Sequence, residues 1–321
     1  MTIMARMHNS RGGAAYSLIA VTLMCMALTA HSLTVAAQAP SQRTFATPQE
    51  AVRGLIAAVK AGNPDELAAI FGPEGQELTA SSDAATGRRT REVFTVAAAE
   101  GWRLVDQGSN RKGLVVGNEG WPFPVPLVKS GKSWRFDAAA GKEEVLARRI
   151  GRNELAVIGI CREYVVAQHR YARQGHDGKP SGLYATSLRS DPGKQNGLYW
   201  PAAKREPLSP FGDLVAQASQ EGRPIGPQPA QPTPFHGYYF RVLTAQGPAA
   251  PGGAKSYLVN GEMAAGFALV AWPAQYDASG IMTFAVNHDG TVHETDLGDA
   301  TETKAAAITA YNPDATWHLA R

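Results

Sequence analysis

The chain has 321 residues, of which 44% are hydrophobic and 18% are charged, and two are cysteines. This composition excludes an intrinsically disordered chain, a collagen-like repeat and a disulfide scaffold. The formal net charge is +3 and no run of basic residues is longer than a pair, so we expect no nucleic-acid partner. The length exceeds what one hydrophobic core usually supports, which predicts two domains.

The first 37 residues have the layout of a secretory signal peptide. Arg6 and Arg11 precede a mostly apolar stretch at 14–30, and Val35 and Ala37 are small enough to precede a cleavage site. Cleavage after Ala37 leaves no long apolar stretch, which predicts a soluble periplasmic or secreted protein without a membrane span. The alternative is a retained membrane anchor, for which about 20 apolar residues are usual.

Residues 44–140 predict a first α+β domain. A capping box at 47–50 and a second helix start at 63–66 predict two helices that meet at a tight corner, and a third helix follows at about 90–100. From residue 101 the hydrophobic period changes to two, which predicts antiparallel strands as far as residue 136.

This first block resembles a known fold. Thr-Pro-Gln-Glu at 47–50, Ala-Gly-Asn-Pro at 61–64 and Lys-Ser-Trp-Arg-Phe at 132–136 resemble the nuclear transport factor 2-like cone, in which helices pack on a curved antiparallel sheet. The resemblance implies either a ligand cavity or a solid core, and it implies no particular chemistry.

Residues 141–321 predict a second block, a long helix followed by an antiparallel sheet. The helix runs from about 141 to 175, a loop-rich middle follows with a short helix at about 210–221 and a linker at 222–234, and strands resume at 238. This order resembles the globular headgroup of type IV pilins. The helix begins with charged residues instead of a membrane-spanning segment, so the resemblance does not extend to assembly into a pilus.

Several patterns that could carry chemistry fail on spacing. Gly131 to Ser133 imitates the end of a phosphate-binding loop, but Pro126 stands where that loop needs glycine. Cys161 and His169 are about 12 Å apart along one helix, too far for a nucleophile and its base. We therefore predict no nucleotide site and no thiol catalysis.

Two imidazoles and three carboxylates gather between residues 288 and 296. They are His288, Asp289, His293, Glu294 and Asp296. Alternation along a strand places neighbouring residues on opposite faces, so we interpret them as the tip of a solvated hairpin. The alternative is a weak Ca²⁺ or Zn²⁺ site.

An aromatic and polar cluster is the strongest candidate for ligand binding. Its members are Tyr199, Trp200, His236, Tyr238, Tyr239 and Arg241. Exposed rings beside a guanidinium suit stacking on a sugar or a peptide, so we expect these residues to line one surface. The alternative is that the rings fix proline-rich loops to the sheet.

Taken whole, the chain from residue 45 onward resembles a bacterial exported family, domain of unknown function 2950. The motifs that carry the resemblance are Trp-Pro-Phe-Pro at 121–124, Ile-Gly-Arg-Asn-Glu at 150–154, Gly-Leu-Tyr-Trp-Pro at 197–201, His-Gly-Tyr-Tyr-Phe-Arg at 236–241 and Gly-Phe-Ala-Leu-Val-Ala-Trp-Pro at 266–273. The resemblance implies membership of the family without an activity.

We predict no catalytic residue, metal or cofactor. The sequence favours a non-catalytic binding or cell-envelope accessory protein, whose partner is a small molecule, a glycan or an envelope protein. The alternative is a periplasmic hydrolase-type enzyme with its site around His236. Binding requires an aromatic-lined groove, whereas hydrolysis requires His236 or the 288–296 cluster beside carboxylates in a cleft.

Overall fold

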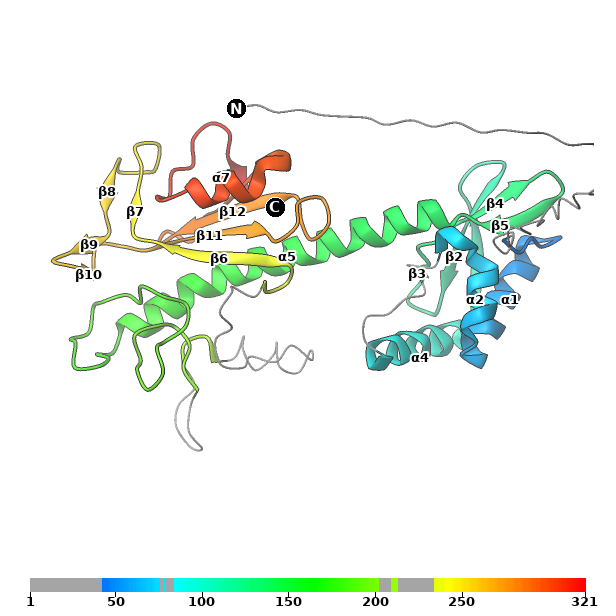
Figure 1. Cartoon of the computed structure of the whole chain (residues 1–321), viewed down its shortest axis with the longest axis horizontal. Coiled ribbons are helices and arrows are strands. Elements are labelled where there is room, and N and C mark those ends of the chain that lie inside the picture. Colours follow the sequence, from blue (N-terminus) through cyan, green and yellow to red (C-terminus); the bar gives the residue numbers. More distant parts are fainter. Residues whose placement is uncertain (1–41, 76–77, 79–83, 202–208, 213–233) are drawn as a thin grey trace, which may run out of the picture. The chain divides into compact units, whose positions relative to one another are not determined.

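The computed structural model describes residues 42–75, 78, 84–201, 209–212 and 234–321 (Figure 1). Helices and antiparallel sheets both form, so the predicted α+β class is confirmed. The predicted signal peptide at 1–37 lies outside the described residues, as do the predicted linker at 222–234 except Pro234 and most of the short helix predicted at about 210–221.

The N-terminal block, residues 42–137, places helices before a sheet. Its elements are α1 (Pro48–Ala61), α2 (Pro64–Phe71), the 3-10 turn η1 (Pro73–Gly75), α4 (Ala84–Glu100), β1 (Trp102–Asp106), β2 (Arg111–Val116), β3 (Trp121–Pro122), β4 (Leu127–Ser130) and β5 (Ser133–Phe136). The strands are antiparallel in the order β1-β2-β4-β5, and β3 pairs with β2.

Side-chain caps fix the first two helices. Thr47 accepts a hydrogen bond from the Glu50 N–H at 3.2 Å, and Asn63 accepts two from the first turn of α2. Gly62 ends α1 with φ of 63°, a left-handed conformation that favours glycine. The resulting corner directs an apolar face of each helix into one core.

The core of this block lies on one face of its sheet. Its buried side chains include Val52, Leu55, Ile70, Phe71, Phe94, Leu114, Val116, Leu127 and Phe136. In β2, Leu114 and Val116 belong to this core, so Gly113 and Val115 lie on the opposite face. One edge of the sheet is covered, because Phe45 and Trp134 exchange backbone hydrogen bonds of 2.8 Å.

A single helix, α5 (Ala138–Ala172), contributes to two cores. Asp137 accepts a hydrogen bond from the Ala140 N–H and so begins the helix. Ala138 is buried with the N-terminal core, whereas Val157, Cys161 and Tyr164 are buried in a second core with the C-terminal sheet. The domain boundary predicted between residues 140 and 141 therefore lies within α5 and not in a loop between two elements.

The C-terminal block, residues 173–321, is built on a second antiparallel sheet. Its elements are β6 (Tyr238–Leu243), β7 (Ala245–Gln246), β8 (Lys255–Ser256), β9 (Leu258–Val259), β10 (Glu262–Met263), β11 (Ala268–Pro273), β12 (Met282–Asn287), β13 (Val292–Asp296), the 3-10 turn η2 (Gly298–Ala300), α7 (Thr301–Ala307) and β14 (His318–Leu319). The main sheet has the order β14-β13-β12-β11-β6, and β7–β8 and β9–β10 form two small hairpins.

Helices cover both faces of the main sheet. The α5 helix lies on one face, where the Tyr164 hydroxyl donates to the Ala268 carbonyl at 3.1 Å, and α7 lies on the other (Figure 1). The core between α5 and the sheet includes Tyr238, Phe267, Leu269, Phe284 and Val286, all fully buried. Side chains that alternate along these strands therefore enter two different environments.

Candidate functional site

The alternation of β6 separates the predicted cluster. Tyr238 is fully buried on the α5 face, and its hydroxyl donates to the Met282 carbonyl at 3.0 Å and to Glu154 at 3.4 Å. Burial raises its pKa above the usual range of tyrosine. Tyr238 is therefore a core residue, and its predicted exposure to a ligand is wrong.

Tyr239 and Arg241 lie on the α7 face and have structural partners. Both contact Trp272, with ring centroids 5.8 Å apart for Tyr239 and the guanidinium 5.2 Å from the ring for Arg241. The same guanidinium donates to three carbonyls at the end of α7, including those of Ala305 and Ile308 at 2.6 and 2.5 Å. The Arg241 side chain therefore caps the C-terminal end of α7.

Trp200 lies close to the C-terminal end of α5. Its ring is 5.5 Å from that of His176, which stacks on Tyr171 at 4.0 Å. Tyr199 exchanges backbone hydrogen bonds with Leu188 and Ser190, and Arg189 lies 5.3 Å from its ring. These contacts hold Trp200 beside the end of α5 and Tyr199 against residues 188–190, and the alternative that the rings fix proline-rich loops to the sheet stays a prediction.

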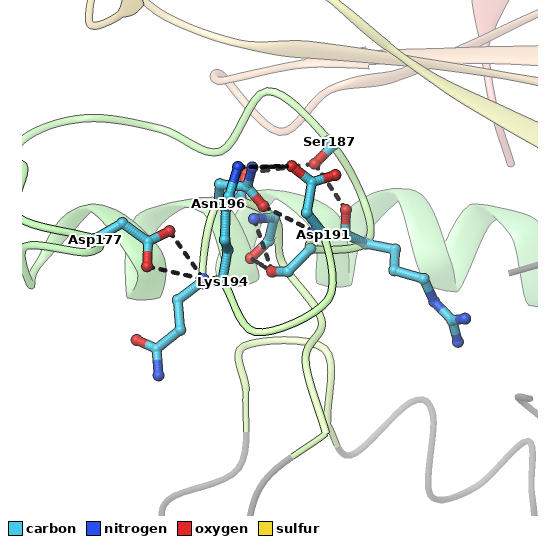
Figure 2. Close-up of polar contacts among 9 residues, drawn as sticks. Asp177, Ser187, Asp191, Lys194 and Asn196 are labelled. Atoms are coloured by element: carbon cyan, nitrogen blue, oxygen red, sulfur yellow. Dashed lines mark hydrogen bonds and ion pairs between the residues drawn. The ribbon is translucent and has the colours of Figure 1, made fainter. Parts of the chain in front are cut away.

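The polar contacts of this loop are largely internal. Figure 2 shows Asp191 paired with Asn196 and Lys194, and Asp177 accepting the backbone N–H of Gln195 at 2.9 and 3.1 Å. The hydrogen bonds with Asn196 and Lys194 hold the pKa of Asp191 below its usual range. The network shapes the turn at 191–194 and brings no catalytic pair together.

The predicted residues do not meet at one surface. His236 occupies the turn before β6 with φ of 48°, and the adjacent Gly237 lies against Asn153 of α5. Trp200 instead lies near Tyr171, eighteen positions further along α5, which is about 27 Å along the helix axis. A binding role for Trp200, His236, Tyr239 or Arg241 individually therefore stays a prediction.

The titratable side chains at 288–296 also do not form one cluster. His293 is 3.0 Å from the Tyr311 hydroxyl, and burial lowers its pKa. Burial, followed by the charge of Glu154, raises the pKa of Glu294 on the opposite face. In the part of the chain that the structure describes, no three His, Cys, Asp or Glu side chains are grouped as metal ligands.

Cys161 is fully buried, and burial raises its pKa to about 12. His169 packs instead against Phe267 and Tyr184, at 5.4 and 6.1 Å between ring centroids. A neutral, buried thiol without a base is unsuited to nucleophilic catalysis.

A cleft in the N-terminal block has a volume of about 590 Å³. It lies on the sheet face opposite the N-terminal core, beside the first turns of α5. Its apolar lining includes Val105, Val115, Pro122, Phe123, Pro124 and Ala147. Its polar lining comprises Gln107, Arg111, Glu143, Glu144 and Arg148. Another cavity, of about 500 Å³, is a groove along α5 at Val166, His169, Ala172 and Arg173.

Glycine sets how closely α5 approaches this cleft. A Cβ atom on Gly141 would lie 2.6 Å from a methyl of Val125, so only glycine allows the helix to pack against residues 123–126 at this distance. The following turns of the helix present Glu144, Ala147 and Arg148 to the cleft.

Arg148 joins the two walls of the cleft. Its guanidinium donates to Glu144 at 2.7 Å and to the Pro122 carbonyl at 2.7 Å, and it lies 5.9 Å from the ring of Trp121. At the other end, Arg111 and Asp137 form an ion pair at 3.6 Å. Charges of both signs thus surround an apolar interior.

The described lining of the cleft lacks several side chains that commonly act in catalysis. None of the described lining residues is Ser, Thr, Cys, His, Lys or Tyr, and the carboxylates of the lining are those of Glu143 and Glu144. The sequence predictions missed this cleft, since its walls come from positions between 105 and 148. The sequence motif that could have indicated the cleft is Trp-Pro-Phe-Pro at 121–124, three residues of which line it. In the structure, Trp121 of this motif is 45% exposed.

Comparison with protein families gives a match over most of the chain. A family model described as a protein of unknown function (DUF2950) matches residues 42–320, which include both blocks. Neither curated proteins nor solved structures gave a match, so the resemblances to the nuclear transport factor 2-like cone and the pilin headgroup stay predictions. Among the described residues, every helix is too short or too polar to cross a lipid bilayer. With both blocks inside the matched region, the chain belongs to the DUF2950 family.

Proposed function

We propose that this protein is an exported, non-catalytic binding protein whose N-terminal cleft takes a small, predominantly apolar molecule. The observation that carries the proposal is a cleft of about 590 Å³ with apolar walls and without a hydroxyl, thiol, imidazole or amine side chain among its described lining residues. Small-molecule sites usually fall between about 300 and 1,000 Å³ and combine apolar walls with a few polar groups. The hydrolase alternative has less support, because His236 lines neither of the two cavities described.

A neutral fluorescent probe tests the cleft. N-phenyl-1-naphthylamine fluoresces on entering an apolar site, so we expect saturable binding to the chain. Ala147→Phe places a ring inside the cleft and should weaken binding at least about tenfold, a loss of about 1.4 kcal/mol.

The matched control adds the same ring to the same helix outside the cleft. Val145 is 39% exposed and does not line the cleft, so Val145→Phe should leave probe binding unchanged. Equal binding by the parent chain and both variants would show that the probe binds elsewhere, and the proposal would fail.

Export is the second part of the proposal. The charged start and the apolar stretch at 14–30 support a periplasmic or secreted location, with cleavage after Ala37. N-terminal sequencing of the protein from the periplasm or medium should give Gln38 as the first residue. A membrane-bound chain that retains residues 14–30 would contradict export as a soluble protein.

A further inference from the structure

The outer edge of β1 presents backbone groups at regular intervals. The Gln107 N–H donates to the Arg111 carbonyl, and the Gly117 N–H donates to that of Gly101, at 3.0 and 2.9 Å. Because antiparallel pairs alternate along the strand, residues 103 and 105 direct their N–H and C=O groups toward β2. Those of Trp102, Leu104 and Asp106 therefore point away from the sheet.

This edge has no covering strand among the described residues. The other edge of the same sheet is covered by Phe45, which pairs with Trp134 in β5. Edge strands are usually blunted by proline, charged side chains, a bulge or a short length, and the five residues of β1 have no proline, lysine or bulge but carry the charges of Arg103 and Asp106. An edge strand whose outward N–H and C=O groups meet no further strand is a template for pairing with another strand.

Side chains beside this edge define what can pair with it. Arg103 and Val105 are both exposed and lie on the same face of the strand, because they are two positions apart. Val105 also lines the cleft. A partner strand is stabilised by a carboxylate opposite Arg103 and by an apolar residue opposite Val105, since directly opposed side chains interact across a sheet.

We propose that β1 binds an extended segment of another polypeptide as an added antiparallel strand, with an acidic residue opposite Arg103 and an apolar residue opposite Val105. A second copy of this chain fits less well. Pairing two copies of β1 about Leu104 sets Arg103 opposite Val105 in both halves, so neither guanidinium meets a carboxylate on that face. The proposal does not depend on the cleft, which can bind a small molecule whether or not the edge is occupied.

A designed peptide tests the edge. The probe is acetyl-Thr-Val-Thr-Glu-Thr-amide, which in antiparallel register sets its valine opposite Val105 and its glutamate opposite Arg103. Amide-resolved hydrogen exchange of the whole chain should show fast exchange at residues 102, 104 and 106 and slow exchange at 103 and 105. Millimolar peptide should then slow exchange at the three outward amides.

N-methylated peptides give the matched control. A methyl group on the central threonine nitrogen removes a hydrogen bond to Leu104 and should weaken binding about five- to tenfold. A methyl group on the glutamate nitrogen, which faces away from β1, should leave affinity within about twofold.

Variants of the chain test the same contacts from the other side. Asp106→Pro removes an outward N–H and should weaken binding about five- to tenfold, whereas Asp106→Ala, which keeps it, should bind like the parent. Arg103→Glu should weaken binding, and a peptide with lysine in place of glutamate should restore it.

Two results would overturn the proposal. If residues 102, 104 and 106 are already protected in the free chain and sedimentation shows a monomer, the edge is covered from within. If they are protected and the chain sediments as a dimer, the occupant is a second copy. Failure of the cleft probe together with binding of the peptide would overturn the proposed function alone.

Discussion

Gln168 satisfies several buried polar groups at once. Its amide donates to the Ala185 carbonyl at 2.8 Å and to the Tyr164 hydroxyl at 3.0 Å, and its oxygen accepts the Ala185 N–H at 2.9 Å. The side chain is fully buried, so these groups have no access to water if it is removed. Gln168 of α5 therefore fixes the backbone of Ala185, which lies in the loop after this helix.

Replacing Gln168 should be costly. Gln168→Leu keeps the volume but leaves the N–H and C=O of Ala185 without partners, and we expect a loss of about 2 to 4 kcal/mol in the free energy of unfolding. Urea unfolding followed by circular dichroism measures it. Glu163→Ala, an exposed change on the same helix, should stay within about 0.5 kcal/mol, and an equal loss in both variants would contradict the role of Gln168.

The buried thiol of Cys161 makes stability depend on pH. Its pKa is about 12 in the folded protein, whereas a thiol in the unfolded chain ionises near pH 8.5. Stability from the neutral thiol is thus fully present below about pH 8.5 and is lost as the pH rises toward 12.

Two measurements check this in a Cys25→Ser background, where Cys161 is the only thiol. Ellman's reagent at pH 8 should react only after unfolding. The difference in unfolding free energy between this protein and its Cys161→Ala variant should shrink between pH 8.5 and 10.5 by up to about 1.4 kcal/mol per pH unit. A constant difference would show that the folded thiol ionises normally.

At the scale of elements, two of the three glycines of α5, Gly141 and Gly151, have different roles. A Cβ atom at Gly141 would clash with Val125, whereas one at Gly151 has no neighbour within 4 Å. The first glycine is required by packing, and the second only weakens the helix.

Alanine at each position should therefore have opposite effects. Gly141→Ala should destabilise the protein by about 1 to 3 kcal/mol, because the stiff, buried Val125 must move. Gly151→Ala should stabilise it by about 0.5 to 1 kcal/mol through helix propensity. Thermal unfolding of both variants tests the pair, and stabilisation by both would show that α5 does not pack closely on residues 123–126.

Sequence patterns predicted elements best where the signal is local. The caps of α1 and α2 and the hairpin between β12 and β13 follow from adjacent residues, and the structure has them at those places. The short helix α7 was missed, because Thr301–Ala307 has little apolar periodicity and depends on the sheet for its end.

The candidate site was predicted less well, for two physical reasons. Adjacent strand residues face opposite sides, so Tyr238 and Tyr239 could never line the same surface. The cleft depends on distant positions such as Val105, Pro122 and Ala147, whose proximity results from the sheet register and from the approach of α5.

At the scale of the whole molecule, the two hydrophobic cores share no buried residue. Each combines part of α5 with its own sheet, so independent folding of the two blocks remains a prediction that the packing favours.

Matched core substitutions test independent folding. Val52→Ala should lower the stability of the N-terminal block alone, and Phe284→Ala that of the C-terminal block alone, by about 2 to 4 kcal/mol each. Urea unfolding with probes in each block should show one transition move while the other stays. A single transition that shifts in both variants would mean that the blocks unfold together.

The contact between Arg241 and α7 has a consequence for the order of folding. A helix of seven residues does not persist alone in water, and its final carbonyls are bound by a side chain more than sixty positions earlier in the chain. The α7 helix can therefore become stable only after β6 has joined its sheet, late in assembly. By the same reasoning its amides belong to the part of the C-terminal block that opens first, well before the sheet beneath it is lost.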